Sequence, residues 1–189
     1  FWAMGAVLAA QFPPLVKNTL YADQGVATLF LAIFSIGVAV GSVAINRMLG
    51  GQVSARYAPA SALMMGLFVL LLYFLSRDWP PSPELVGIAT FLSYPLGWAV
   101  VLDLFGVALA GGMFVVPLYA FLTTTVPKSE TARTVAANNI VNSGAMVAAT
   151  LMLTGLVIVG VSVAETLFLV AVASVVAAWL GWKLHLACD

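Results

Sequence analysis

The chain has 189 residues, of which 63% are hydrophobic and only 7% are charged, and its formal net charge is zero. Soluble domains typically carry about 25% charged residues, so we expect lipid to surround much of this chain. The lack of net positive charge argues against nucleic acid as a partner. The sequence begins inside an apolar run and without an initiating Met, which we interpret as the mark of a fragment of a longer protein.

A membrane-spanning helix needs about 20 apolar residues, and the sequence predicts an all-α membrane protein with six such spans. The predicted spans are residues 1–20, 25–45, 58–76, 99–125, 131–159 and 163–184. The apolar stretch at 84–126 is too long for one span and short for two. We favour a short interfacial or re-entrant segment at 84–94, with residues 95–98 leading into the fourth span. The alternative is one strongly tilted helix that extends outside the bilayer.

Basic residues predict the orientation of the spans, because cytoplasmic loops favour Lys and Arg. If both ends of the segment are cytoplasmic, most of the basic residues lie on the inner side. The inner ones are Arg47, Arg56, Lys128, Arg133 and Lys183, and the outer ones are Lys17 and Arg77. The sequence therefore predicts a multi-pass protein with both ends of this segment in the cytoplasm.

Two proline-containing stretches occupy matching places in the predicted spans. Pro13 and Pro14 lie in the first span, and Pro117 lies in the fourth, after Gly111 and Gly112. Proline kinks a helix, and interrupted helices at corresponding places in two repeats point to the substrate path of a transporter. The first span runs outward and the fourth inward, which predicts two inverted three-helix repeats. Proline and glycine are also common in ordinary membrane helices, so either stretch alone has a structural explanation.

Three polar or charged side chains within the spans are further candidates for the substrate path. Gln11 precedes the proline pair, Lys17 follows it, and Asp103 lies early in the fourth span. A charge deep in a membrane helix is a functional hypothesis by default, whereas a lysine near a helix end can snorkel to the interface. Lys17 and Asp103 belong to the same half of the bilayer and could pair. If Asp103 lines a cavity, it could carry a proton or bind a cationic headgroup.

Asn138, Asn139 and Asn142 form a polar cluster in the fifth span. Spacings of three and four place Asn142 on a helix face shared with both of the others. These amides either join helices by hydrogen bonds or line the path near its cytoplasmic mouth. Gly37 and Gly41 in the second span predict close packing against another helix.

The sequence offers little for catalysis. Its one histidine, His185, and its one cysteine, Cys188, lie near the end of the last predicted span, and no paired carboxylates occur. We therefore predict no catalytic residue, no metal site and no cofactor, and we do not expect this segment to be an enzyme.

Six spans, a basic loop after the second span and proline-containing first and fourth spans resemble one half of a major facilitator superfamily transporter. The loop Ser42–Gly50 is a degenerate form of the loop signature of that superfamily: Asn46 and Arg47 are present, but the first glycine and the later basic pair are missing. The segments Gly111–Ala120 and Asn138–Met146 are similar to the bacterial lysophospholipid transporter family. That family includes forms fused to a phospholipid acyltransferase and an acyl-carrier-protein ligase.

This resemblance implies a twelve-helix fold in two six-helix halves, of which residues 1–189 would be the C-terminal half without its N-terminal partner. It implies that lysophospholipid is flipped across the bacterial inner membrane by alternating access. It places Gly111, Gly112 and Pro117 in the kinked fourth helix, and Asn138 and Asn142 in the fifth. Two alternatives stay open: a drug or small-solute exporter of the same fold, and a membrane anchor module of a fused phospholipid acyltransferase.

Overall fold

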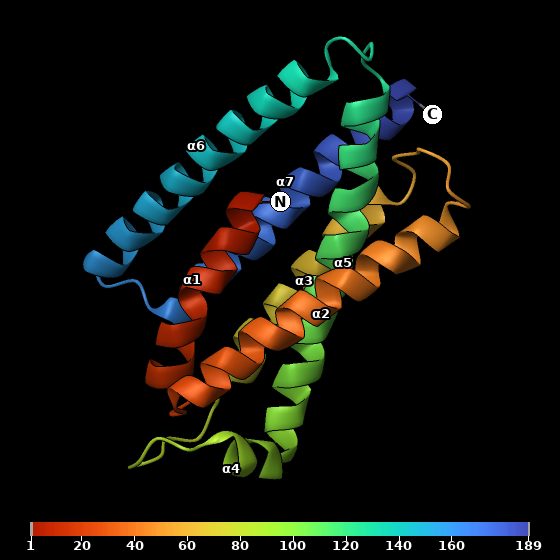
Figure 1. Ribbon diagram of the computed structural model, residues 1–189. Helices are drawn as coiled ribbons and strands as arrows, with labels where there is room; N and C mark the ends of the chain where they lie inside the picture. Colours follow the sequence, from red (N-terminus) through yellow and green to blue (C-terminus); the bar gives the residue numbers. More distant parts are fainter. Residues whose placement is uncertain (1, 189) are drawn as a thin grey trace.

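The computed structural model describes residues 2–188, which form helices joined by turns and loops (Figure 1). The helices are α1 (Trp2–Asn18), α2 (Gln24–Met48), α3 (Ala58–Arg77), α4 (Ile88–Ser93), α5 (Pro95–Thr124), α6 (Thr131–Ile158) and α7 (Val163–Cys188). Five of them, α2, α3, α5, α6 and α7, are long and apolar enough to cross a membrane. The 17 residues of α1 extend about 26 Å at a rise of about 1.5 Å per residue, a little less than the hydrocarbon core of about 30 Å. The all-helical character predicted from the sequence is confirmed, and five of the six predicted spans are helices with the length and composition of membrane spans.

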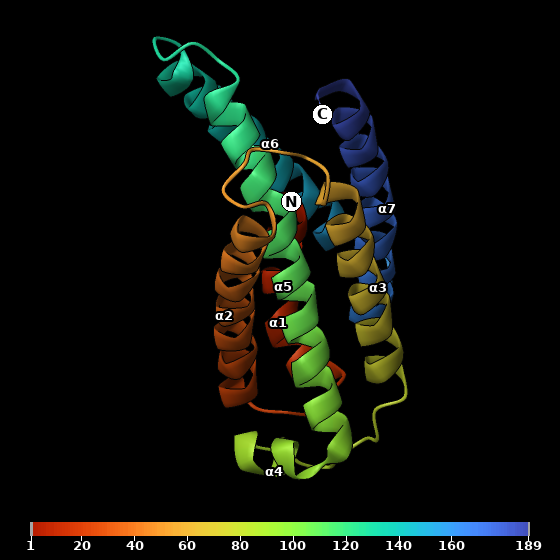
Figure 2. The same ribbon diagram turned by 90° about the vertical axis from the view of Figure 1, so that its right-hand side faces the viewer.

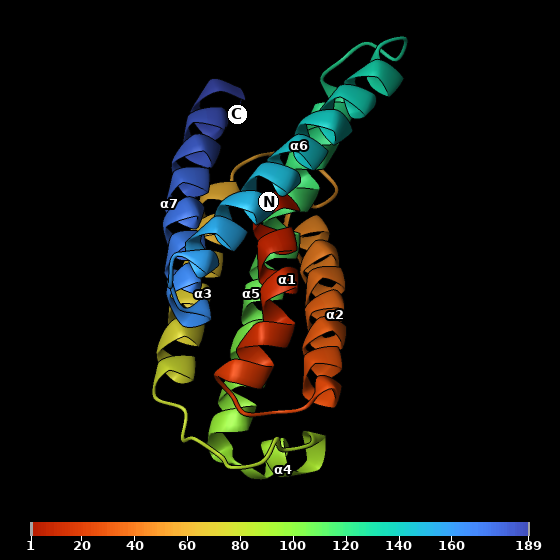
Figure 3. The ribbon, with the colours of Figure 1, turned by 90° about the vertical axis from the view of Figure 1, so that its left-hand side faces the viewer.

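Successive long helices run in opposite directions along the bundle (Figures 2 and 3). The short α4 lies at one end, and the α2–α3 and α5–α6 loops lie toward the other. α5 packs against α2 on one side and α3 on the other, and α7 packs against the far side of α3. α1 contacts α2, α6 and α7.

One large apolar core lies between α1, α2, α3 and α5, on the side toward α4. Its largest fully buried side chains include Phe12, Phe30, Leu72, Phe91 and Leu104. In contrast, the only buried residue described on α6 is Leu153. Most of the surface of α6 is therefore left for lipid or for another protein segment to cover.

Glycines allow α2 and α5 to approach each other closely. Gly37 and Gly41 of α2 are buried against the backbone of residues 105–109 of α5, and Gly112 of α5 is buried against the backbone of α2 at Val38. A side chain at any of these three positions would overlap the neighbouring helix. The packing role predicted for Gly37 and Gly41 is therefore confirmed.

The stretch at 84–98 is divided between two helices. α4 is a separate short helix, and α5 begins at Pro95, so the long helix starts before the predicted fourth span at 99–125. Proline is favoured in the first turn of a helix, because its missing N–H would have no partner within the helix there. Residues 95–98 therefore belong to the long helix and are not a lead-in.

The segment that contains α4 is fastened to the turn between α1 and α2. The Val86 N–H donates to the carbonyl of Tyr21 at 2.9 Å, and the Asp23 N–H donates to the carbonyl of Val86 at 3.0 Å. The Asp23 side chain also caps α2 by accepting from the Val26 N–H. On the core side, the rings of Trp79 and Phe91 stack with their centroids 5.2 Å apart.

Neither proline stretch interrupts its helix. Pro13 and Pro14 lie within α1, and Pro117 lies within α5, and the helical conformation continues on both sides of each. The missing proline donors are therefore accommodated without unwinding of either helix.

Candidate functional site

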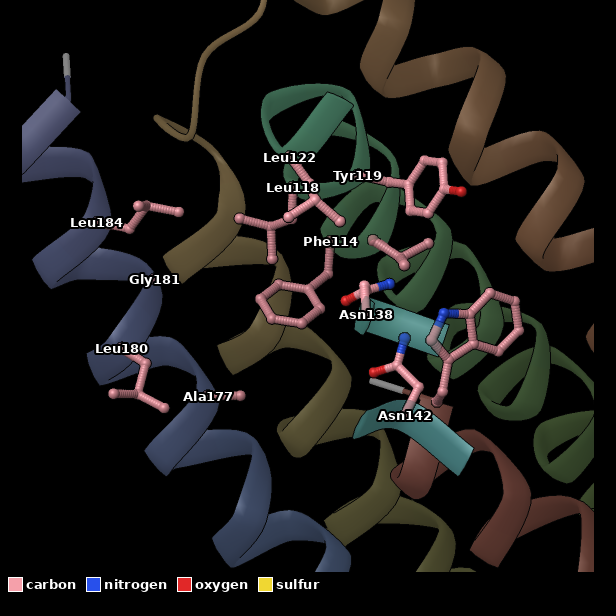
Figure 4. Close-up of a pocket in the computed structure, with 12 residues that line it drawn as sticks. Phe114, Leu118, Tyr119, Leu122, Asn138, Asn142, Ala177, Leu180, Gly181 and Leu184 are labelled. Atoms are coloured by element: carbon pink, nitrogen blue, oxygen red, sulfur yellow. The ribbon is translucent and has the colours of Figure 1, made fainter. Parts of the chain in front are cut away.

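An open groove of about 380 Å³ lies between α5, α6 and α7, away from α4. We call it the α5–α6–α7 groove (Figure 4). α5 contributes Phe114, Val115, Leu118, Tyr119 and Leu122, α6 contributes Asn138 and Asn142, α7 contributes Ala177, Leu180, Gly181 and Leu184, and Trp2 of α1 completes the lining.

Asn138 and Asn142 form the polar side of this groove. They lie one helical turn apart on the same face of α6, and both are half-buried. Their side chains point across the groove toward Phe114 and Leu118 of α5 (Figure 4). Asn139 is exposed and lines a neighbouring hollow beside Tyr119. The structure thus brings two of the predicted path residues together at one groove and separates the third asparagine from them.

The remaining walls of the groove are largely apolar. Leucines at 118 and 122 on α5 face leucines at 180 and 184 on α7, and none of the described lining residues is charged. Ligand sites typically combine apolar walls with a few polar groups that fix orientation. An amide strip opposite leucine walls suits a molecule that has a polar region and an aliphatic chain.

Pro13, Pro14 and Lys17 lie at a different place, near the α4 end of the bundle. They line a hollow with Asn18, Asp23 and Gln24, and Lys17 is exposed there. This arrangement matches a lysine that reaches the membrane interface, and it does not place Lys17 on the α5–α6–α7 groove.

Gln11 joins α1 to α7 within the protein. Its side chain is only 4% exposed, and its Nε2 donates to the Oγ1 of Thr166 at 3.3 Å. A buried amide with a partner on another helix acts as an interhelical tie.

Asp103 is buried in the N-terminal third of α5, with an exposed fraction of 4%. Neither of its carboxylate oxygens has a hydrogen-bond partner among the described residues. Lys17 is exposed and donates to neither oxygen of Asp103, so the pairing that the sequence suggested is not formed.

Gly111, Gly112 and Pro117 are buried along α5. They do not line the α5–α6–α7 groove, and Gly112 instead contacts the backbone of α2. These three residues therefore pack α5 against its neighbours, and other residues of α5 face the groove.

Most of the groove residues carry no signal in the sequence that marks them as functional. Phe114, Leu118 and Leu122 recur every four residues on α5, and Ala177, Leu180, Gly181 and Leu184 recur every three or four on α7. This spacing marks one face of a helix, but a stripe facing a groove has the same composition as a stripe facing lipid. Only the relative placement of the helices distinguishes the two.

Among the described residues, no group of three or more His, Cys, Asp or Glu side chains is placed to hold a metal ion. A scan against protein-family models, a search of curated proteins and a search of solved structures each found no match to this chain.

Proposed function

We propose that this chain is the C-terminal half of a secondary transporter of the major facilitator type, which flips lysophospholipid across the bacterial inner membrane. In this proposal both ends of the segment are cytoplasmic, and a second six-helix half faces it. The two halves rock about a shared substrate path in alternating access. No catalytic group takes part.

The observation that carries the proposal is the pattern of helix contacts. Suppose that α1 is exchanged with α5, α2 with α6 and α3 with α7. The α2–α5 contact then becomes the α1–α6 contact, and the α3–α5 contact becomes the α1–α7 contact. The α1–α2 contact becomes the α5–α6 contact, and the α3–α7 contact becomes itself. The exchange matches which helices meet and not how extensively they meet, because α2–α5 and α3–α5 are much larger contacts than α1–α6 and α1–α7. The small α6–α7 contact and the contacts made by α4 have no counterpart.

The direction of the helices shows that the exchanged sets are inverted relative to each other. Because successive long helices alternate in direction (Figure 3), helices three places apart, such as α1 and α5, are antiparallel. Exchanging the two sets therefore also inverts them, as in the inverted-topology repeats of secondary transporters. This supports the predicted arrangement of two inverted three-helix repeats.

The choice of substrate is supported by where the family resemblance lies. The segment Gly111–Ala120 supplies much of the α5 wall of the α5–α6–α7 groove, and the segment Asn138–Met146 supplies both asparagines. The leucine walls suit an acyl chain, and the amides can donate to the ester or phosphate oxygens of a lysolipid. The described residues that line the groove are uncharged, which is also compatible with an uncharged drug, so the experiment must separate these substrates.

The full-length protein should be reconstituted into vesicles with fluorescent lysophosphatidylethanolamine in one leaflet. We expect the protein to move the label between leaflets, and we expect Asn138→Ala combined with Asn142→Ala to reduce the rate several-fold. Ser143→Ala is the matched control, because Ser143 is exposed on the same helix and lies outside the groove lining.

Correctly folded protein that moves no lysolipid would overturn the proposal. Movement of a hydrophobic drug without movement of lysolipid would identify an exporter. No transport of either compound, together with an acyltransferase encoded in the same chain, would identify a membrane anchor.

A further inference from the structure

We propose that Asp103 is a proton-binding site, and that loss of its proton accompanies movement of α5 against α3. The link to transport rests on the function proposed above, whereas the binding of a proton does not.

The surroundings of Asp103 are apolar on its own helix and on the neighbouring one. Val100 and Val107, one turn away on either side, are buried. At Gly106, the ring of Phe68 from α3 lies so close that a Cβ atom on the glycine would come within 2.7 Å of the phenylalanine Cζ. Gly106 lies one turn from Asp103 on α5, so this tight α3–α5 contact is next to the residue, and both carboxylate oxygens of Asp103 are buried.

Neither carboxylate oxygen of Asp103 is bonded to an opposite charge among the described residues. The helices that pack against α5 are α2, α3, α4 and α6. Their charged or titratable residues are Arg47 of α2, Tyr73 and Arg77 of α3, and Arg133 of α6. α4 contains no such residue, and α5 itself contains Tyr119 besides Asp103. The three arginines are exposed, and neither oxygen of Asp103 is hydrogen-bonded to any described residue.

An ionised carboxylate without a partner is strongly disfavoured in such surroundings, and a buried acid of this kind takes up a proton instead. The packing of the helices gains nothing from this residue, because an apolar side chain of similar size would fill the space without the cost of enclosing a polar group. A carboxyl group within a membrane span is therefore explained better by a function that uses its proton. Since the group is enclosed beside the α3–α5 contact, movement of α5 against α3 would give the proton a route out.

Infrared spectroscopy of the purified full-length protein tests proton binding directly. We expect a carboxylic-acid C=O band at neutral pH that disappears as the pH is raised, and that is missing in Asp103→Asn. Asp78→Asn is the control, because Asp78 is exposed at the end of α3 and should leave the band unchanged. If Asp103→Asn keeps the same band, Asp103 is ionised and the proposal is wrong.

Thermal unfolding provides a second readout. If the folded chain holds a proton on Asp103 that the unfolded chain releases, the stability of the wild type falls as the pH rises. We expect this part of the pH dependence to be lost in both Asp103→Asn and Asp103→Leu. An unchanged pH dependence in both variants would contradict proton binding.

Transport measurements test the coupling. A pH gradient imposed across the vesicle membrane should change the rate at which the wild type and Asp78→Asn move lysolipid. It should not change the rate for Asp103→Asn. A rate that depends equally on the gradient in Asp103→Asn would overturn the coupling. If the wild type moves no lysolipid at all, the proposed function fails, and the infrared result still decides whether Asp103 binds a proton.

Discussion

Gly37 of α2 lies so close to Ala108 of α5 that a Cβ atom on the glycine would come within 2.6 Å of the Cβ of the alanine. One turn further along α2, Gly41 is in similar contact with the backbone of Leu109. The two helices are therefore held at a separation that admits no side chain at either position, and the position of α5 depends on this contact.

We expect Gly37→Ala and Gly41→Ala each to destabilise the protein by about 1–3 kcal/mol, because inserting an atom into a packed contact forces the backbones apart. The midpoint of thermal unfolding in detergent measures the effect. Gly144→Ala is the matched control, since a Cβ atom at that glycine would meet nothing within 4 Å. Equal unfolding midpoints for all three variants would show that the α2–α5 contact tolerates a wider separation.

The hydrogen bond between Gln11 and Thr166 should contribute measurably to the docking of α1 on α7. In a double-mutant cycle of Gln11→Leu and Thr166→Val, we expect a coupling energy of about 0.6 kcal/mol, the average for hydrogen bonds between membrane helices, and no more than about 1.7 kcal/mol. Thr166 also donates to the carbonyl of Val163, and only the cycle separates this local bond from the interhelical one. Strictly additive changes in unfolding free energy would mean that the Gln11 bond contributes nothing.

Trp79 should hold the segment around α4 against the core. Its stacking on Phe91 continues through an edge contact between Phe91 and Phe30, whose ring centroids are 6.0 Å apart. Removing one ring of such a pair costs about 0.5–1.5 kcal/mol beyond the loss of buried area. We therefore expect Trp79→Ala to speed amide hydrogen exchange across residues 79–94. Trp98→Ala, at an exposed tryptophan on α5, should leave exchange in this segment unchanged.

Lys17 and Asp103 should behave as independent sites. Because they form no ion pair, we expect the effects of Lys17→Met and Asp103→Asn on unfolding free energy to add within about 0.5 kcal/mol. Lys17→Met alone should change stability by no more than about 0.5 kcal/mol, as is usual for an exposed position. A coupling energy well above this value would indicate that the two side chains meet in another conformation of the protein.

The sequence by itself determined the class of the protein and most of its elements. Long apolar runs can satisfy their backbone only as helices in lipid, so the composition predicts membrane helices. Local signals also placed several features, such as the tight contact expected at Gly37 and Gly41. The predicted span at 163–184 begins where α7 begins, at Val163, and Ser162 and Glu165 cap each other's backbone N–H groups there. The start of α5 was missed because Pro95 reads equally well as part of a loop.

Only the tertiary structure decided which residues meet. Asn138 and Asn142 line a groove because α5 and α7 lie opposite them. Lys17 lies at the other end of the bundle, and the side chain of Gln11 is hydrogen-bonded to Thr166. In a chain this apolar, nearly every helix face has a similar composition, so periodicity identifies the faces without saying which of them faces lipid, a groove or another helix. The enclosure of Asp103 without a partner depends in the same way on how α3 packs on α5, which no local pattern encodes.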